Sequence, residues 1–136
     1  MGCLLCENER NQIIVYNDLY RLVLVEDPYY VGYIRLIWNT HIKEMTDLSH
    51  EEAMIIFEAI LQIENIMRKT LNPDKINIAS LGNVVTHLHW HIIPRFCQDR
   101  HFPNSIWGEI THINYLPDLI KIQKQQEMVD RLMVLL

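Results

Sequence analysis

The chain has 136 residues and a formal net charge of -5; 49% of its residues are hydrophobic and 21% are charged. This length and balance predict one globular domain over residues 1–136, with enough apolar side chains for a sizeable core. The acidic balance argues against binding to nucleic acid or to an anionic membrane, because both need a basic surface. No apolar stretch reaches ~20 residues and the start lacks the basic region of a signal peptide, so we expect a cytoplasmic protein without membrane or nucleic-acid partners.

The first third of the chain predicts three strands. Residues 13–16 and 19–25 are rich in β-branched, leucine and aromatic side chains, and the turn-forming Asn17 lies between them. A loop around Gly32 leads into a third candidate strand over residues 33–38.

The clearest predicted helix follows Ser49, which forms a capping-box pattern with Glu52 three residues later. Apolar residues then recur at helical spacing until Asn72-Pro73 ends the helix. This apolar stripe comprises Ile56, Ile60, Ile63 and Met67. We interpret it as core packing and not as a cofactor site.

Two more strands, residues 76–81 and 87–94, are joined by a short link with a turn, so we expect them to pair as a hairpin. Residues 97–116 are aperiodic, and a final helix is predicted from Pro117 to residue 132. Strands on both sides of one long helix indicate an α+β fold. We expect an antiparallel sheet of about five strands, one long helix and a C-terminal helix.

Three histidines, His87, His89 and His91, alternate inside an apolar run. Successive side chains of a strand point to opposite faces, so this spacing predicts that the three imidazoles share one face. Such a row favours nucleophilic attack, proton transfer or metal binding, and the alternative is a solvated strand face. The outer two would lie roughly 13 Å apart, which leaves His89 as the natural attacker with a neighbour on each side.

Residues 82–95 resemble the signature of the histidine triad (HIT) superfamily, in which three histidines alternate with apolar residues after a glycine turn. The resemblance covers about residues 3 to 110. Within the superfamily, the chain resembles a bacterial branch of nucleotide hydrolases. It implies nucleotidyl transfer or hydrolysis of a nucleoside phosphate derivative, such as a dinucleoside polyphosphate or a nucleoside phosphoramidate. It also implies a symmetric homodimer.

The resemblance assigns a role to each histidine of the run. His89 would attack the α-phosphorus and form a nucleotidyl-histidine that water then cleaves. His91 would meet the phosphoryl charge as a donor, together with backbone N–H groups near Asn83, and His87 completes the triad.

Some positions depart from the HIT pattern. These departures bear on the identity of the substrate more than on the class of reaction. Tyr33 follows the glycine where many members have histidine, and Val84 stands where many have a hydroxyl side chain. The ribose is usually held by an acidic residue after the second strand, which here is Glu26 or Asp27. The alternative interpretation of these two acidic residues is a solvated turn pair.

A structural zinc site is the second implication of the resemblance. Several HIT-like branches complete a C-x-x-C pair with the histidine after the third strand and the first histidine of the triad. Those positions are filled here by Cys3, Cys6, His41 and His87. The alternative is that both cysteines lie reduced in a frayed N-terminus and that His41 is a surface residue.

Two other functions are compatible with these residues. A nucleotide-binding regulatory module with little catalysis would explain the departures at Tyr33 and Val84. A protein whose triad itself holds a metal ion is disfavoured by the span between the outer histidines. Two features after the triad have open interpretations: Trp107 packs on a base or anchors its loop, and Arg95 contacts phosphate or is exposed.

Overall fold

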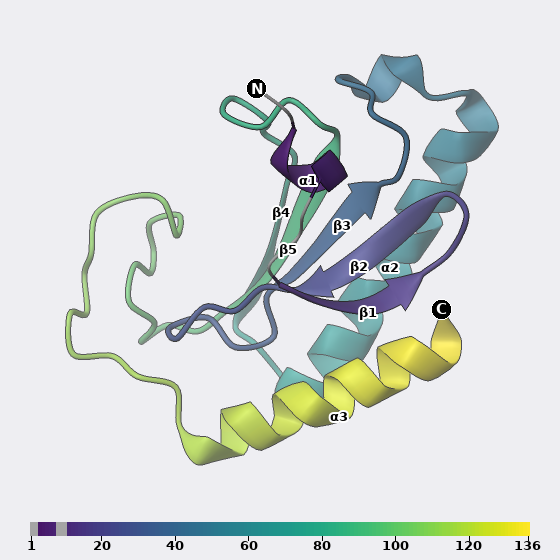
Figure 1. Ribbon diagram of the computed structural model, residues 1–136. Coiled ribbons are helices and arrows are strands. Elements are labelled where there is room, and N and C mark those ends of the chain that lie inside the picture. The colour runs from purple at the N-terminus through teal and green to yellow at the C-terminus, as the bar shows by residue number, and fades with distance from the viewer. Residues whose placement is uncertain (1–2, 8–10) are drawn as a thin grey trace.

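The computed structural model describes residues 3–7 and 11–136 (Figure 1). In chain order its elements are α1 (Leu4–Glu7), β1 (Gln12–Tyr16), β2 (Tyr20–Leu24), β3 (Ile34–Trp38), the 3-10 helix η1 (Met45–Asp47), α2 (His50–Leu71), β4 (Lys75–Ala79), β5 (His89–Arg95) and α3 (Leu119–Leu135).

The five strands form one antiparallel sheet in the order β1-β2-β3-β5-β4. The β1–β2 turn forms where expected, because Asn17 Oδ1 accepts hydrogen bonds from Leu19 N and Tyr20 N, both at 2.9 Å. β4 and β5 are neighbours, as the predicted hairpin requires. The α+β prediction is confirmed.

The two faces of the sheet are buried by different parts of the chain. One face supplies residues such as Leu36, Trp90 and Ile92 to the main core, which α2 and α3 cover. The opposite face carries His89, His91 and Ile37, and α1 lies on that side (Figure 1). β5 is therefore buried along its whole length.

α2 follows its sequence signals closely. Ser49 Oγ accepts from Glu52 N at 3.1 Å, and Glu52 Oε1 accepts from Ser49 N at 2.8 Å, which completes the capping box. The predicted stripe is buried, and Asn72 ends the helix in the left-handed conformation with a φ of 48°.

α3 begins at Leu119, with Asp118 as its N-cap, and ends at Leu135, three residues beyond the predicted end. Met128, Val129 and Leu132 are buried, and the helix contacts both α2 and β1. Among the described residues, no helix is long and apolar enough to cross a membrane.

The fifth strand was predicted to include His87, and this was wrong: β5 begins at His89. Leu88 N donates to Ile42 O at 2.9 Å instead of to the facing strand. The Trp38 carbonyl then accepts from the Nε2 of His87. The backbone keeps one further bond to β3, from Trp38 N to Leu88 O at 3.2 Å, and His87 lies beyond it. The three histidines therefore do not form one strand row.

The interpretation of Arg95 as an exposed residue was also wrong, because its side chain is 2% exposed. It forms an ion pair with Asp99, with 2.8 Å between Arg95 Nε and Asp99 Oδ2. Asp99 is equally buried and also accepts from the backbone N–H groups of Phe96 and Phe102. This buried pair fixes the start of the long loop between β5 and α3, which extends from the sheet in Figure 1.

Candidate active site

His89 and His91 lie side by side on the face of the sheet away from α2. Both are 7% exposed, and their ring centroids are 5.0 Å apart at an interplanar angle of 77°. β5 places them at alternate positions, with Ile37 and Arg35 of β3 as their cross-strand neighbours. Two imidazoles are therefore in contact, so one can act as a nucleophile while its neighbour donates a hydrogen bond.

The ring of His89 is oriented by the backbone two residues earlier. Its Nδ1 lies 2.6 Å from the carbonyl oxygen of His87. A carbonyl oxygen only accepts, so Nδ1 carries the proton and the lone pair of a neutral ring is on Nε2. This is the tautomer of an imidazole that attacks through Nε2.

The ring of His91 contacts the hydroxyl of Tyr33, with 2.5 Å between His91 Nδ1 and Tyr33 Oη. Burial, reinforced by the charges of His89 and Arg35, lowers the pKa of His91 to about 3. His91 is therefore a neutral hydrogen-bonding group at neutral pH. The sequence had singled out Tyr33 only as a departure from the family pattern.

The loop after β5 reaches this pair through Trp107. The Trp107 ring packs edge-on against His91, with centroids 5.0 Å apart at 74°, and is 52% exposed. Phe102 lies instead under the Arg95 guanidinium, 5.6 Å from its ring centroid. Phe102 therefore packs within the loop, whereas Trp107 borders the histidine pair.

The predicted substrate-binding residues are more exposed than the histidine pair. Asn83 and Glu26 are exposed, and Asp27 is half-buried, accepting from Tyr29 N at 2.8 Å. Burial raises the pKa of Tyr33, and the negative charge of Asp27 adds to this rise. The charge of Asp27 therefore acts on the Tyr33 hydroxyl, which contacts His91.

The four predicted metal ligands form one cluster. The candidate ligand atoms of Cys3, Cys6, His41 and His87 all lie within 4.8 Å of one another. His87 Nδ1 lies 3.2 Å from His41 Nδ1, 3.3 Å from Cys6 Sγ and 3.6 Å from Cys3 Sγ. Tetrahedral zinc places nitrogen ligands about 3.3 Å apart and nitrogen and sulfur about 3.6 Å apart, so this donor set fits the ion.

The surroundings support the same geometry. His87 Nε2 donates to the Trp38 carbonyl, which leaves Nδ1 with the lone pair that a metal ligand needs. Arg21 donates to the carbonyl of Leu5 and so ties α1 to β2. Leu5 also packs against Val23 and Ile37. Thus α1 is attached to the sheet by contacts beside Cys3 and Cys6.

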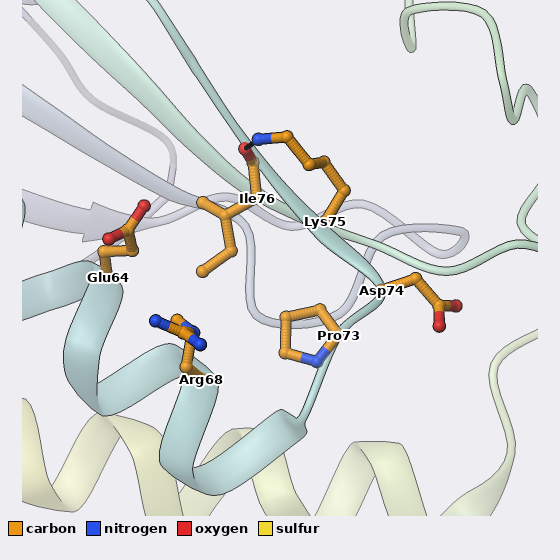
Figure 2. A pocket seen from close by; sticks show the side chains of 6 residues that line it. All are labelled: Glu64, Arg68, Pro73, Asp74, Lys75 and Ile76. Atoms are coloured by element: carbon orange, nitrogen blue, oxygen red, sulfur yellow. Dashed lines mark hydrogen bonds between the residues drawn. The ribbon is translucent and has the colours of Figure 1, made fainter.

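A separate hollow of about 270 Å³ lies between the end of α2 and the start of β4 (Figure 2). It is lined by Glu64, Arg68, Pro73, Asp74, Lys75 and Ile76. Two of these side chains are basic and two are acidic, and Lys75 Nζ donates to the Ile76 carbonyl at 2.7 Å. It contains neither histidine nor cysteine, so we place the candidate site at the histidine pair.

Residues 7–98 match the family model of the HIT domain. The chain belongs to the HIT family. A histidine triad protein of Bradyrhizobium japonicum has a similar structure, with a TM-score of 0.75 and 25% identity over 90% of each chain. These findings confirm the family and the fold predicted from the histidine run.

Two relatives show the breadth of the HIT family. An uncharacterised HIT-like protein of Saccharolobus solfataricus is 30% identical over 103 residues, which are 71% of this chain and 74% of that protein. A bis(5'-adenosyl)-triphosphatase of Saccharomyces cerevisiae is 29% identical over 90 residues, 61% of this chain and 44% of the yeast protein. The matched segment thus spans less than half of the yeast protein.

The low pKa of His91 predicts that acid weakens the fold. The ordinary value is 6.5 and the folded value is about 3, so between them the unfolded chain binds a proton that the folded chain does not. The free energy of unfolding therefore falls as the pH drops through this window, by up to about 1.4 kcal/mol per pH unit. Urea unfolding from pH ~7.5 to ~4 should show a shallower decline in His91→Gln than in the wild type.

The exposed His50, at the start of α2, provides the control. His50→Gln should keep the wild-type slope. An unchanged slope in His91→Gln would contradict the prediction.

Proposed function

We propose that this protein hydrolyses nucleoside phosphate derivatives, or transfers their nucleotidyl group, with His89 as the nucleophile. Dinucleoside polyphosphates and nucleoside phosphoramidates are the proposed substrates. The observation that carries the proposal is the bond from His89 Nδ1 to the His87 carbonyl, since it directs the Nε2 lone pair to the reaction. The HIT family assignment and the named activity of the yeast relative also support it.

The reaction proceeds in two displacements. His89 Nε2 forms a bond to the α-phosphorus while the bond to the leaving group breaks, and the leaving group departs with its electron pair. The ring becomes positively charged, and the carbonyl of His87 stabilises that charge through Nδ1–H. Water then attacks the same phosphorus, and the bond from phosphorus to Nε2 breaks with its electron pair returning to the ring. This releases a nucleoside monophosphate and one proton to the solvent and restores neutral His89.

The neighbours of His89 supply the remaining roles. His91 donates a hydrogen bond to the phosphoryl group, and it does so as a neutral ring. Trp107 borders the nucleotide on the solvent side of His91. Asp27, rather than Glu26, is the proposed partner of the ribose hydroxyls, and Asn83 offers its backbone to the phosphate from an exposed turn.

Replacing the nucleophile should abolish turnover. We expect His89→Ala to lower the rate on diadenosine triphosphate and on adenosine phosphoramidate by about 10³-fold or more, because no other group forms the covalent bond. Steady-state rates measure the loss, and circular dichroism checks the fold.

His50→Ala is the matched control, because this histidine is exposed on α2. Retained turnover in His89→Ala would refute the nucleophile. Calorimetric nucleotide binding by a wild type without turnover would favour the regulatory module.

We also propose a structural zinc ion at Cys3, Cys6, His41 and His87. Four protein ligands leave no open position, so the ion would fix α1 to the start of the triad and would not contact the substrate. It would hold the segment whose carbonyl orients His89.

The zinc site can be tested with two cysteine variants. Protein purified without chelator should contain about one zinc per chain, and Cys6→Ser should lose most of it and unfold at a lower temperature. Cys97→Ser is the control, because Cys97 is exposed and outside the cluster. A wild type without zinc by elemental analysis would exclude the site.

Finally, we propose that the protein forms a homodimer through α2 and β4. Met54, Phe57 and Leu61 lie within one helical face of α2, and each is at least 44% exposed. β4 is an edge strand of the described sheet, where a second copy could pair.

Light scattering should give twice the mass of one chain for the wild type. Leu61→Lys should shift the protein to single-chain mass, because it places a charge in the apolar face. Val134→Lys, on α3, should not, although Val134 is 89% exposed. A wild type of single-chain mass would contradict the proposal.

A further inference from the structure

We propose that Tyr33 is a positioning residue for the reaction proposed above, because its hydroxyl donates to His91 Nδ1 and so keeps the proton of that ring on Nε2. His91 would then present an N–H to the phosphate, whereas the other tautomer would present a lone pair to a negatively charged group. The catalytic role of Tyr33 rests on the proposed function. Its effect on the tautomer of His91 can be tested without measuring turnover.

The contact joins two rigid parts of the fold. Tyr33 immediately precedes β3, His91 is in the middle of β5, and the two strands are hydrogen-bonded neighbours. Tyr33 is 3% exposed, and its Oη lies 2.5 Å from His91 Nδ1. This hydroxyl therefore contacts the ring where water has little access.

The backbone before Tyr33 is also fixed. Gly32 has a φ of +77°, and a Cβ at this position would lie 2.5 Å from Leu71 Cδ1. Gly32 N donates to the Gln125 side chain on α3 at 2.5 Å. Contacts with both long helices thus hold the turn that presents Tyr33 to His91.

The direction of the hydrogen bond follows from the chemistry of the two groups. A phenol O–H is a stronger donor than a neutral imidazole N–H, and an imidazole nitrogen is a stronger acceptor than a phenol oxygen. The positive charge of Arg35, the cross-strand neighbour of His91, favours the same direction because it attracts the oxygen of Tyr33 and not its proton. With Nδ1 of His91 as the acceptor, the single proton of a neutral imidazole is on Nε2.

Burial keeps both partners in these protonation states. It raises the pKa of Tyr33, so the phenol keeps its proton, and it lowers the pKa of His91, so the ring stays neutral. The pair therefore acts as a fixed neutral donor chain, from Tyr33 to His91.

Tyr33→Phe removes the hydroxyl and keeps the ring. Two-bond ¹H–¹⁵N spectra of histidine-labelled protein report which ring nitrogen is protonated, and His91→Gln identifies the His91 signals. We expect the Nε2–H tautomer in the wild type and a mixture of tautomers in Tyr33→Phe. We also expect kcat to fall about tenfold while KM changes less than about twofold, because the lost interaction matters mainly in the transition state.

Tyr30 provides a matched control. It is also buried, and its hydroxyl lies 2.5 Å from the Nδ1 of a different histidine, His101. Tyr30→Phe should leave the His91 tautomer and kcat unchanged. A fall in kcat in both variants without a change in the His91 tautomer would mean a general loss of packing and would overturn the inference.

The wild-type spectrum alone is also decisive, should Tyr33→Phe fail to fold. An Nδ1–H tautomer of His91 in the wild type would overturn the inference, whatever the activity. A wild type that hydrolyses none of the substrates would instead refute the proposed function, while the Nε2–H tautomer and its loss in Tyr33→Phe would still support the role of Tyr33.

Discussion

The backbone hydrogen bond from Leu88 N to Ile42 O separates the three histidines of the run by their surroundings. The last paired residues of β3 and β5 are Ile37 and His89, and Trp38 N still donates to Leu88 O. The chain then turns away from the sheet at His87. The His87 ring then lies in the cysteine cluster, while its carbonyl contacts His89. The same residue therefore supplies a side chain to the cluster and a carbonyl group to the histidine pair.

The histidine face of the sheet is unusual because its polar groups are buried. Arg21, His89 and His91 are each at most 9% exposed, and the carbonyl, hydroxyl and aromatic contacts described above surround them. Burying polar groups without partners is costly, so these partners have to be in place as the fold forms. The Arg95–Asp99 pair meets the same requirement under the long loop, where removing either residue would leave a buried charge uncompensated.

Local signals in the sequence predicted the elements well. The capping box and apolar stripe of α2 depend on residues a few positions apart, and the motif of alternating histidines indicated the family directly. The four cluster residues were also named from the sequence, by resemblance, and the structure brings them together. Their metal, and the roles assigned to the site residues, are still predictions.

The missed features all depend on contacts between distant segments. The Tyr33–His91 contact joins residues 58 positions apart, and Arg95 is buried because the following loop folds back over it. His87 was assigned to the strand because alternation persists through it, yet backbone pairing with Ile42 decides where the strand begins. The periodicity of the sequence does not show these contacts, because each depends on which donors and acceptors the fold brings together.

The three tryptophans are distributed unevenly between interior and surface. Trp38 and Trp90 are each 3% exposed within the core, whereas Trp107 is 52% exposed beside His91. A small water-borne quencher can therefore collide with the indole of Trp107 far more readily than with the other two. The chain carries its own optical reporter at the rim of the histidine pair, with no label to attach.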